Sequence, residues 1–439
     1  MIKYLYKTYN YIKLLYHIRY IYNNIDINND LYWIDILKND IERCGSMAIK
    51  CVQWILPRYE LSNPKSKVLD NFKDFYDNCN IHELSYTKNI YKKYKNTNLT
   101  DDYKIIKLLG SGSIGQVYLV SDIKTNIKYA LKINHPDLNI DYSIFKIFFK
   151  SILLFINYKK YIPIDDIDSF LQSMKNQIDL NNEYEYNKRF VDIYKNNDCI
   201  IIPEIIEHYE NMILIKYIDG IKFTKIHSEY ERSKILTLLS IFTSNTCLHN
   251  LSHGDLHIGN WSIKDGKLIV YDYGFCFNIS SIEYKLLDEL ISLDEKEMII
   301  PKFFNYYLDK EYNQNVDKEL IIKSLDTIIK KYREIDSPIL KNFLHSVTEF
   351  CIEYDILLSS TCINGLIIFL QTSSYYDSVA NCSKNSTYTS YLVNILSTCK
   401  TYNICPELID YTNKKIDDNN NNTNIEKDFS KFEGLKKFM

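Results

Sequence analysis

The residues best suited to chemistry lie in the run His253-Gly254-Asp255-Leu256-His257-Ile258-Gly259-Asn260. Asp255 and Asn260 stand in the spacing H-x-D-x-x-x-x-N, in which an aspartate orients the proton of a substrate hydroxyl and an asparagine ligates a metal. Val270-Tyr271-Asp272-Tyr273-Gly274 follows as a variant of D-F-G. Its Asp272 offers the hard oxygen ligand that Mg²⁺ prefers. The spacing predicts a magnesium-assisted phosphoryl-transfer site.

The histidines of the same run allow a second interpretation as a transition-metal site. Either His253, Asp255 and His257, or His249, His253 and His257, would supply the ligands. No cysteine or further acid stands at ligand spacing, so this interpretation is the less favoured one.

A glycine-rich segment precedes these residues and is expected to form a turn between two strands, Tyr103 to Leu109 and Gln116 to Ser121. It reads Gly110-Ser111-Gly112-Ser113-Ile114-Gly115-Gln116-Val117 and matches G-x-G-x-x-G-x-V. Glycines let the backbone approach phosphates closely, and free N–H groups supply donors. The strand context favours a kinase loop over a dinucleotide-binding loop, which should lead into a helix.

A third expected strand, Ile127 to Ile133, ends in Ala130-Leu131-Lys132. Kinases place the lysine that grips the α- and β-phosphates at this point and pair it with a carboxylate on a helix. Glu183 and Glu185 both lie in a segment with helical spacing, so either could be the partner.

These elements must be positioned by a two-lobed arrangement. Residues 1–100 read as a helical N-terminal extension, 101–218 as a strand-rich lobe with inserted helices, and 219–415 as a helical lobe. Further strands are expected at 200–206, 212–218 and about 267–271. Residues 416–439, with a run of asparagines, read as a disordered low-complexity tail. The expected fold class is α+β, a bilobal protein-kinase-like fold.

Four further segments resemble the UbiB-like atypical kinases, also called AarF-domain or ADCK-type kinases. Gly45 to Gln53 resembles the K-x-G-Q helix of that family, and Gln177 to Glu183 resembles its E-x-D segment. Met212 to Gly220 resembles the hinge strand, and Lys132 to Pro136 the lysine strand. The resemblance covers about residues 35 to 290.

The resemblance implies an ATP- and Mg²⁺-dependent phosphotransferase. If the matching residues have the roles they have in the family, Lys132 pairs with Glu183 and Asp255 is the catalytic acid/base residue. Asn260 and Asp272 would then bind Mg²⁺. The nucleotide would contact the glycine-rich segment, Ala130 and the backbone of Ile215, Lys216 and Tyr217. Members of the family assist coenzyme Q or other isoprenoid-lipid metabolism, and their phosphoryl acceptors are uncertain.

The resemblance also implies a helical lid built from Lys50, Gln53, Gln177 and Asp179, and here the chain departs from the pattern. Val52 replaces the K-x-G-Q glycine, Gln177 replaces the E-x-D glutamate, and a glycine-rich loop replaces an alanine-rich one. A neutral amide gives Lys50 an ordinary hydrogen bond at best, about 0.5–1.5 kcal/mol. One hypothesis for these departures is that the lid is looser and that phosphoryl transfer resembles that of an ordinary kinase. The alternative is that the departures reflect relaxed selection.

Two other functions stay open at this point. Aminoglycoside- and choline-kinase-type phosphotransferases also carry H-G-D-x-H-x-x-N, although they do not need the Lys50 or Gln177 segments. A pseudokinase regulator that binds nucleotide usually lacks the lysine, the catalytic aspartate or the metal aspartate, and all are present here. An ATPase coupled to lipid extraction lies between these classes.

Composition limits the partners and the compartment that we expect for this protein. A net charge of -3 argues against nucleic-acid binding. Eleven cysteines without a C-x-x-C pair indicate reduced thiols and a cytoplasmic location, with mitochondrial targeting by Met1 to Tyr22 less favoured. No transmembrane helix is expected. Ile144 to Ile156 reads as a core helix, or as a peripheral membrane contact. The acceptor could be a protein, a lipid or a small molecule.

Overall fold

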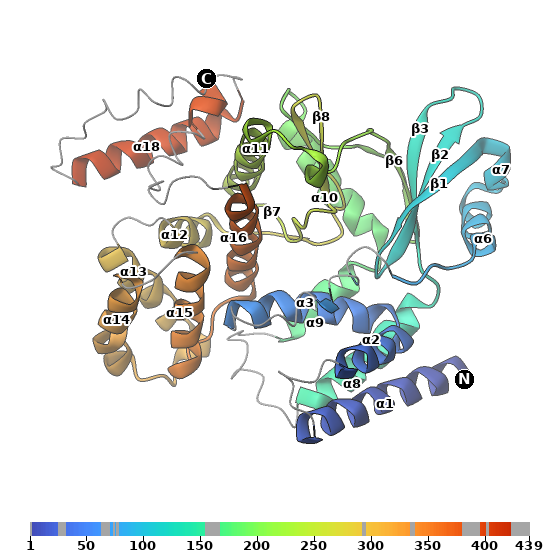
Figure 1. Ribbon diagram of the computed structural model, residues 1–439. Coiled ribbons are helices and arrows are strands. Elements are labelled where there is room, and N and C mark those ends of the chain that lie inside the picture. Colours follow the sequence, from blue (N-terminus) through green and yellow to red (C-terminus); the bar gives the residue numbers. More distant parts are fainter. Residues whose placement is uncertain are drawn as a thin grey trace.

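The computed structural model describes ten stretches of the chain: residues 2–24, 32–62, 71–72, 75, 79–153, 167–291, 296–333, 339–379, 396–400 and 404–422. They form an α+β, bilobal, kinase-like fold, with a strand-rich lobe and a larger helical lobe (Figure 1). A set of N-terminal helices packs beside both.

The small lobe is a five-stranded antiparallel sheet with the order β1-β2-β3-β6-β5. Its strands are β1 (Tyr103–Ser111), β2 (Gly115–Asp122), β3 (Lys128–Asn134), β5 (Ile205–Tyr209) and β6 (Met212–Lys216). The β2–β3 turn is stabilised by Asp122, whose carboxylate accepts from the backbone N–H groups of Lys124 and Thr125, while Asn126 takes φ 58°. Asparagine tolerates this left-handed conformation better than most residues.

Helices pack against both faces of this sheet. Helix α10 (Leu180–Tyr194) begins at Asp179, whose side chain accepts from Asn181 N and caps the helix. Helices α6 (Leu84–Lys95) and α7 (Leu99–Asp102) contribute Tyr91 and Leu99 to the apolar cluster of the sheet. The predicted boundary at residue 100 therefore falls inside a packed unit.

The predicted strand at 200–206 is wrong as a single element. Ile200–Ile201 forms β4, which pairs with β9 in the other lobe, whereas Ile205–Tyr209 forms β5 of the small-lobe sheet. Pro203 lies between them and has no N–H to donate to a continuous ladder. The chain thus uses this segment to join two sheets.

Five helices pack beside the small lobe around a core of their own. They are α1 (Ile2–Asn24), α2 (Tyr32–Cys44), α3 (Ser46–Ser62), α8 (Leu138–Leu153) and α9 (Ile167–Asn176). Helix α8 buries Ile144 and Phe145 in this core, as expected of a core helix, and leaves Ile147 exposed. Residues 154–156 of that predicted segment lie outside the described residues.

The large lobe is organised around the buried helix α11 (Glu229–Leu248). The short strands β7 (Ser252–His253), β8 (Trp261–Lys264), β9 (Lys267–Val270) and β10 (Cys276–Phe277) flank the run His253 to Asn260, called the catalytic loop below after its predicted role, and Asp272. The remaining helices are α12 (Ser281–Ile291), α13 (Lys296–Leu308), α14 (Lys318–Arg333), α15 (Ile339–Glu353), α16 (Ser360–Val379) and α18 (Pro406–Asn422), with short 3₁₀ turns at Phe223–Lys225 and Glu311–Asn313.

The predicted tail begins too early. Helix α18 continues through Asn422; it starts at Pro406, whose φ is preset for a helix, and Leu408 is buried in the core of the large lobe. Residues 423–439 lie outside the described residues. Among the described helices, none combines the length and apolarity needed to cross a membrane.

Candidate active site

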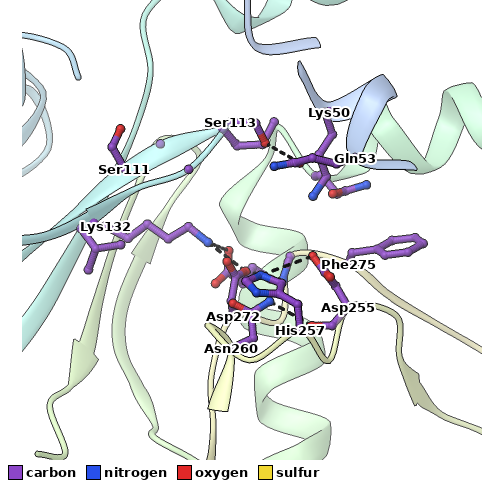
Figure 2. Close-up of a pocket in the computed structure, with 18 residues that line it drawn as sticks. Lys50, Gln53, Ser111, Ser113, Lys132, Asp255, His257, Asn260, Asp272 and Phe275 are labelled. Atoms are coloured by element: carbon purple, nitrogen blue, oxygen red, sulfur yellow. Dashed lines mark hydrogen bonds and ion pairs between the residues drawn. The ribbon is translucent and has the colours of Figure 1, made fainter. Parts of the chain in front are cut away.

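A cavity of about 620 Å³ lies between the small-lobe sheet and the catalytic-loop region and continues into a polar recess of about 170 Å³. The larger part is lined by apolar residues of β1 and β3 and by the β6 hinge, which is the composition expected of a base-binding pocket. The recess is lined by the glycine-rich turn, Lys132, Asp255, Asn260 and Asp272. Figure 2 shows these side chains converging from both lobes.

Lys132 links the two lobes inside this recess. Its Nζ donates to Glu183 Oε2 at 2.8 Å and to Asp272 Oδ1 at 3.1 Å. Strand β3 positions the lysine opposite Val117 of β2 and Ile213 of β6, and helix α10 carries Glu183 on its buried face. Glu185, the other candidate partner, is exposed.

The electrostatics follow from one lysine facing two carboxylates. Burial alone would lower the pKa of Lys132, but Asp272 and Glu183 raise it above its ordinary value. Burial raises the pKa of Glu183 to about 7, against the attraction of Lys132. Burial would also raise the pKa of Asp272, but Lys132 and Lys50 hold it well below its usual range. Asp272 is therefore the carboxylate that stays ionised.

The backbone of Asp272 has an unusual conformation, with φ 52°. Such left-handed conformations cost free energy for residues other than glycine and cluster at functional sites. Gly274 N donates to Asp272 Oδ1 at 3.1 Å, which holds the side chain toward the recess. With Asn260 across the recess, Asp272 offers oxygen donors of the kind that suit Mg²⁺.

The catalytic loop is held by hydrogen bonds from the core. Asn260 Nδ2 donates to Asp255 O at 2.9 Å, and Trp261 Nε1 and Tyr375 Oη both donate to Leu256 O at 3.2 Å. The side chain of Asp255 stays partly exposed to the recess, with His257 Nε2 4.0 Å from its Oδ2. These contacts fix the loop, and the Asp255 carboxylate stays accessible from the recess.

The transition-metal interpretation is not supported within the described part of the chain, where no group of three potential ligands gathers. His253 is buried, its Nε2 donates to Tyr271 O at 3.0 Å, and its Nδ1 accepts from Asp255 N. Burial lowers the pKa of His253, which fits this neutral tautomer. Both ring nitrogens are therefore engaged within the protein.

The glycine-rich turn closes tightly over the recess. Gly112 N donates to Gly115 O at 3.0 Å, and a Cβ on Gly115 would approach Ile133 O to 2.4 Å. Gly110, Ser111, Gly112, Ser113, Ile114, Gly115 and Val117 all line the recess, whereas Ala130, Ile215, Lys216 and Tyr217 line the larger cavity.

Three of the four predicted lid residues contact this site. Lys50, Gln53 and Gln177 line the recess, and Figure 2 shows Lys50 and Gln53 reaching toward it from α3. Ser113 Oγ donates to Gln53 Oε1 at 3.1 Å, and Gln177 Nε2 donates to Ser173 O. Asp179 instead caps α10 and does not line the recess.

The cavity also contains residues that sequence reasoning missed. Residues 79–82 contact the ends of β1 and β2 beside the glycine-rich turn, where Cys79 N donates to Ser111 O at 3.0 Å and His82 N to Gln116 Oε1, and Cys79 and Ile81 line the larger cavity. Tyr271 lines it as well and shares a 2.5 Å hydrogen bond with Ser262. Tyr271 precedes Asp272 directly, so its position was a usable signal; nothing in the sequence marks Cys79 or Ile81.

A comparison with family models identifies the domain. The ABC1 atypical kinase-like domain matches residues 74–299, just over half of the chain. The chain belongs to this family. The match agrees with the UbiB-like resemblance and covers the sheet, α10 and the catalytic loop.

Curated relatives cover smaller parts of the chain. The ABC1 family protein C21C3.03, mitochondrial, of Schizosaccharomyces pombe is 24% identical over 277 residues, 53% of this chain and 39% of the relative. A probable bifunctional tRNA threonylcarbamoyladenosine biosynthesis protein of Methanosphaera stadtmanae is 31% identical over 126 residues, 28% of this chain and 23% of the relative. The chain thus spans well under half the length of these relatives.

Among solved structures, Rv3197 of Mycobacterium tuberculosis, in complex with erythromycin, is 16% identical with a TM-score of 0.44, over 73% of this chain and 89% of that one. The Rio2 kinase of Chaetomium thermophilum, in an ADP/Mg²⁺-phosphoaspartate complex, is 14% identical with a TM-score of 0.30, over 65% and 85%.

The expected cytoplasmic location is wrong by this comparison. It rested on reduced cysteines, and the ten that the structure describes are indeed free and buried. Free thiols, however, do not distinguish one reducing compartment from another. The fission-yeast relative is named as mitochondrial.

Proposed function

We propose that the chain binds Mg·ATP and transfers the γ-phosphoryl group to an acceptor. The observation that carries the proposal is the contact of the buried Lys132 with both Glu183, at 2.8 Å, and the partly exposed Asp272, at 3.1 Å. Kinases need this lysine–glutamate pair and this aspartate together for phosphoryl transfer. The family membership supports the same class of reaction.

The proposed role of each residue follows from its place in the cavity. Ala130 and the backbone at Ile215 to Tyr217 would hold the base in the larger cavity, and the glycine-rich turn would cover the phosphates. Lys132 would bind the α- and β-phosphates, and Asp255 would orient the acceptor hydroxyl for attack in line. Asn260 and Asp272 would hold Mg²⁺, which when bound neutralises charge that develops on the phosphates.

Lys50 would add a second cation on the lid side. It lines the recess, and its charge contributes to the depressed pKa of Asp272. Gln177 stands where the resemblance places a glutamate, so an amide instead of a carboxylate lines the recess together with Lys50. We propose that Lys50 contacts the terminal phosphate when ATP is bound.

The acceptor is proposed from the family resemblance alone, as a substrate linked to isoprenoid-lipid metabolism of the coenzyme Q type. The name of the fission-yeast relative makes mitochondria the compartment in which to look for it. A small alcohol remains the alternative acceptor, as in the aminoglycoside and choline kinases.

Turnover of Mg·ATP by the purified chain tests the proposal. Wild type, Asp255→Asn and Asp272→Asn would be compared for nucleotide binding with and without Mg²⁺, and for phosphate release or transfer to protein, lipid and small-alcohol acceptors. Binding that needs Mg²⁺ and is lost in Asp272→Asn, with turnover lost in Asp255→Asn, supports it. Metal-independent binding that is unchanged in Asp272→Asn, with no turnover, would instead identify a pseudokinase.

A further inference from the structure

Residues 79–82, called the 79–82 segment below, form neither helix nor strand but are held firmly against the glycine-rich turn. Cys79 N donates to Ser111 O at 3.0 Å, and Ser111 Oγ donates back to the next carbonyl of the segment at 3.2 Å. Gln116 accepts from His82 N at 3.0 Å and donates to His82 O at 3.1 Å. Ser111 and Gln116 are both buried, so these four hydrogen bonds hold the segment in one position.

The segment adds apolar surface to the larger cavity. Ile81 lines this cavity although 66% of the residue is exposed, and Cys79 lines it as well. Leu108 and Leu109 of β1 line the same cavity and are each 39% exposed. The 79–82 segment therefore extends the apolar wall of the cavity beyond the five-stranded sheet. A large apolar side chain that is already fixed beside a cavity gains free energy when a ligand covers it, because little order has to be imposed on binding.

The position of the segment relates it to one end of a bound nucleotide. Cys79 and Ile81 line the larger cavity, which also contains the hinge residues 215–217. Neither residue lines the polar recess, which contains the turn residues 112–115. Kinases hold the phosphates of ATP beneath the glycine-rich loop. The base and the sugar, and not the phosphates, therefore lie on the side of the 79–82 segment.

We propose that the 79–82 segment is part of the nucleoside-binding site, with Ile81 packed against the base and sugar of the nucleotide whose binding is the proposed function, on which this inference rests. The contact buries apolar surface of the side chain and of the nucleoside together. This gain does not depend on how many phosphates the nucleotide carries. Ile81 therefore contributes equally to the binding of ATP, ADP and adenosine.

The acceptor of the phosphoryl group matches this wall less well. Its hydroxyl has to reach Asp255, which lines the recess and not the larger cavity. Ile81 lines the larger cavity and not the recess. A nucleotide occupies both parts of the cavity at once, so it is the ligand that meets the 79–82 segment.

Equilibrium binding to the full chain tests the proposal, with Mg·ATP, Mg·ADP and adenosine each competing against radiolabelled ATP. Ile81→Ala should raise the Kd of all three ligands by the same factor, roughly five-fold. Ile81→Leu should recover most of this loss. The matched control is Ile106→Ala on β1, which truncates an exposed isoleucine that lines neither part of the cavity and should leave every Kd unchanged. Since Ile81 is exposed, thermal unfolding without ligand should be the same for all these proteins.

Two results of this experiment would overturn the inference and leave the proposed function standing. One is a set of wild-type Kd values for Ile81→Ala. The other is a Kd that rises for ATP and ADP but not for adenosine. A wild-type chain that binds none of the three ligands would overturn the proposed function together with the inference.

Alkylation of Cys79 reads the same contact without a substitution. Among the ten cysteines that the structure describes, Cys79 is the one that lines the cavity, and Cys405 is a reference of similar burial in the large lobe, at 7% exposure against 8%. Adenosine should slow the reaction of Cys79 with N-ethylmaleimide several-fold and leave that of Cys405 unchanged, because a thiol must be accessible to react. Mass spectrometry of the labelled peptides measures both rates. Protection of Cys79 that is absent, or no greater than that of Cys405, would contradict the proposed contact.

Discussion

Lys132 Nζ lies 2.8 Å from Glu183 Oε2 and, on its other side, 3.1 Å from Asp272 Oδ1. One cation thus joins strand β3, helix α10 and the segment around Asp272, which come from the two lobes.

Replacing this lysine should lower turnover. For Lys132→Met we expect kcat/KM for ATP to fall by about 10²–10³-fold, since one preorganised charge on the phosphates is lost. Steady-state phosphate release measures this. The control is Lys128→Met at the exposed start of the same strand, which should leave kcat/KM unchanged. Equal effects of the two substitutions would contradict the assigned role.

Glu183 should make stability depend on pH. Its pKa rises to about 7 in the folded protein because it is buried, against about 4.3 in an unfolded chain. Between these two pKa values the folded protein holds a proton that the unfolded chain has lost. The stabilisation of the folded state that comes from protonated Glu183 is therefore complete below the lower pKa. It is lost as pH rises through about 7. Wild type should lose on the order of 1–3 kcal/mol of unfolding free energy between pH 5 and 8 relative to Glu183→Gln.

Urea unfolding at a series of pH values measures this difference. Glu185→Gln is the control, because Glu185 lies on the exposed side of the same helix. Its unfolding free energy should follow that of wild type at every pH. If the unfolding free energies of wild type and Glu183→Gln change with pH in parallel, Glu183 titrates alike in the folded and unfolded states, and the prediction is wrong.

The motif residues were predictable because their spacing along the chain reflects local structure. The turn between β1 and β2 and the run from His253 to Asn260 are short segments, and their chemistry is visible in the residue types. The strand at 200–206 was misread, because alternation cannot say which sheet a strand joins. The pairing of Lys7 with Asp141 and of His82 with His135 joins residues 134 and 53 positions apart. Only tertiary packing decides such contacts.

Restoring a carboxylate to the lid should weaken nucleotide binding. Gln177→Glu adds a negative charge to a recess that already holds Asp255, Glu183 and Asp272, and it draws Lys50 away from the phosphates. A pair of this kind is worth about 1 kcal/mol, so we expect the Kd for Mg·ATP to rise roughly five-fold. Calorimetric titration measures it. Gln172→Glu on the exposed side of α9 is the matched control, and an equal Kd for both variants would refute the expected role of Lys50.

A pair of histidines should control the position of the glycine-rich turn. His135 Nε2 donates to Gly112 O at 3.0 Å, so its Nδ1 must accept, and His82 Nδ1 donates to it at 2.8 Å. His82 Nε2 then accepts from Thr87 Oγ1 at 2.9 Å. Burial lowers the pKa of both rings, that of His82 to about 4, which keeps this neutral arrangement at neutral pH.

His135→Leu removes the donor that holds Gly112, so the KM for ATP should rise several-fold while kcat changes less. The loss of one buried hydrogen bond is worth about 1 kcal/mol, or about five-fold. His135→Gln places an amide Nε2 where the ring nitrogen was and should recover most of the affinity. A purely structural role would instead lower stability in both variants without this separation of KM from kcat. Steady-state kinetics together with thermal unfolding of the three proteins distinguishes the two outcomes, and equal KM values for His135→Leu and His135→Gln would exclude the hydrogen bond as the cause.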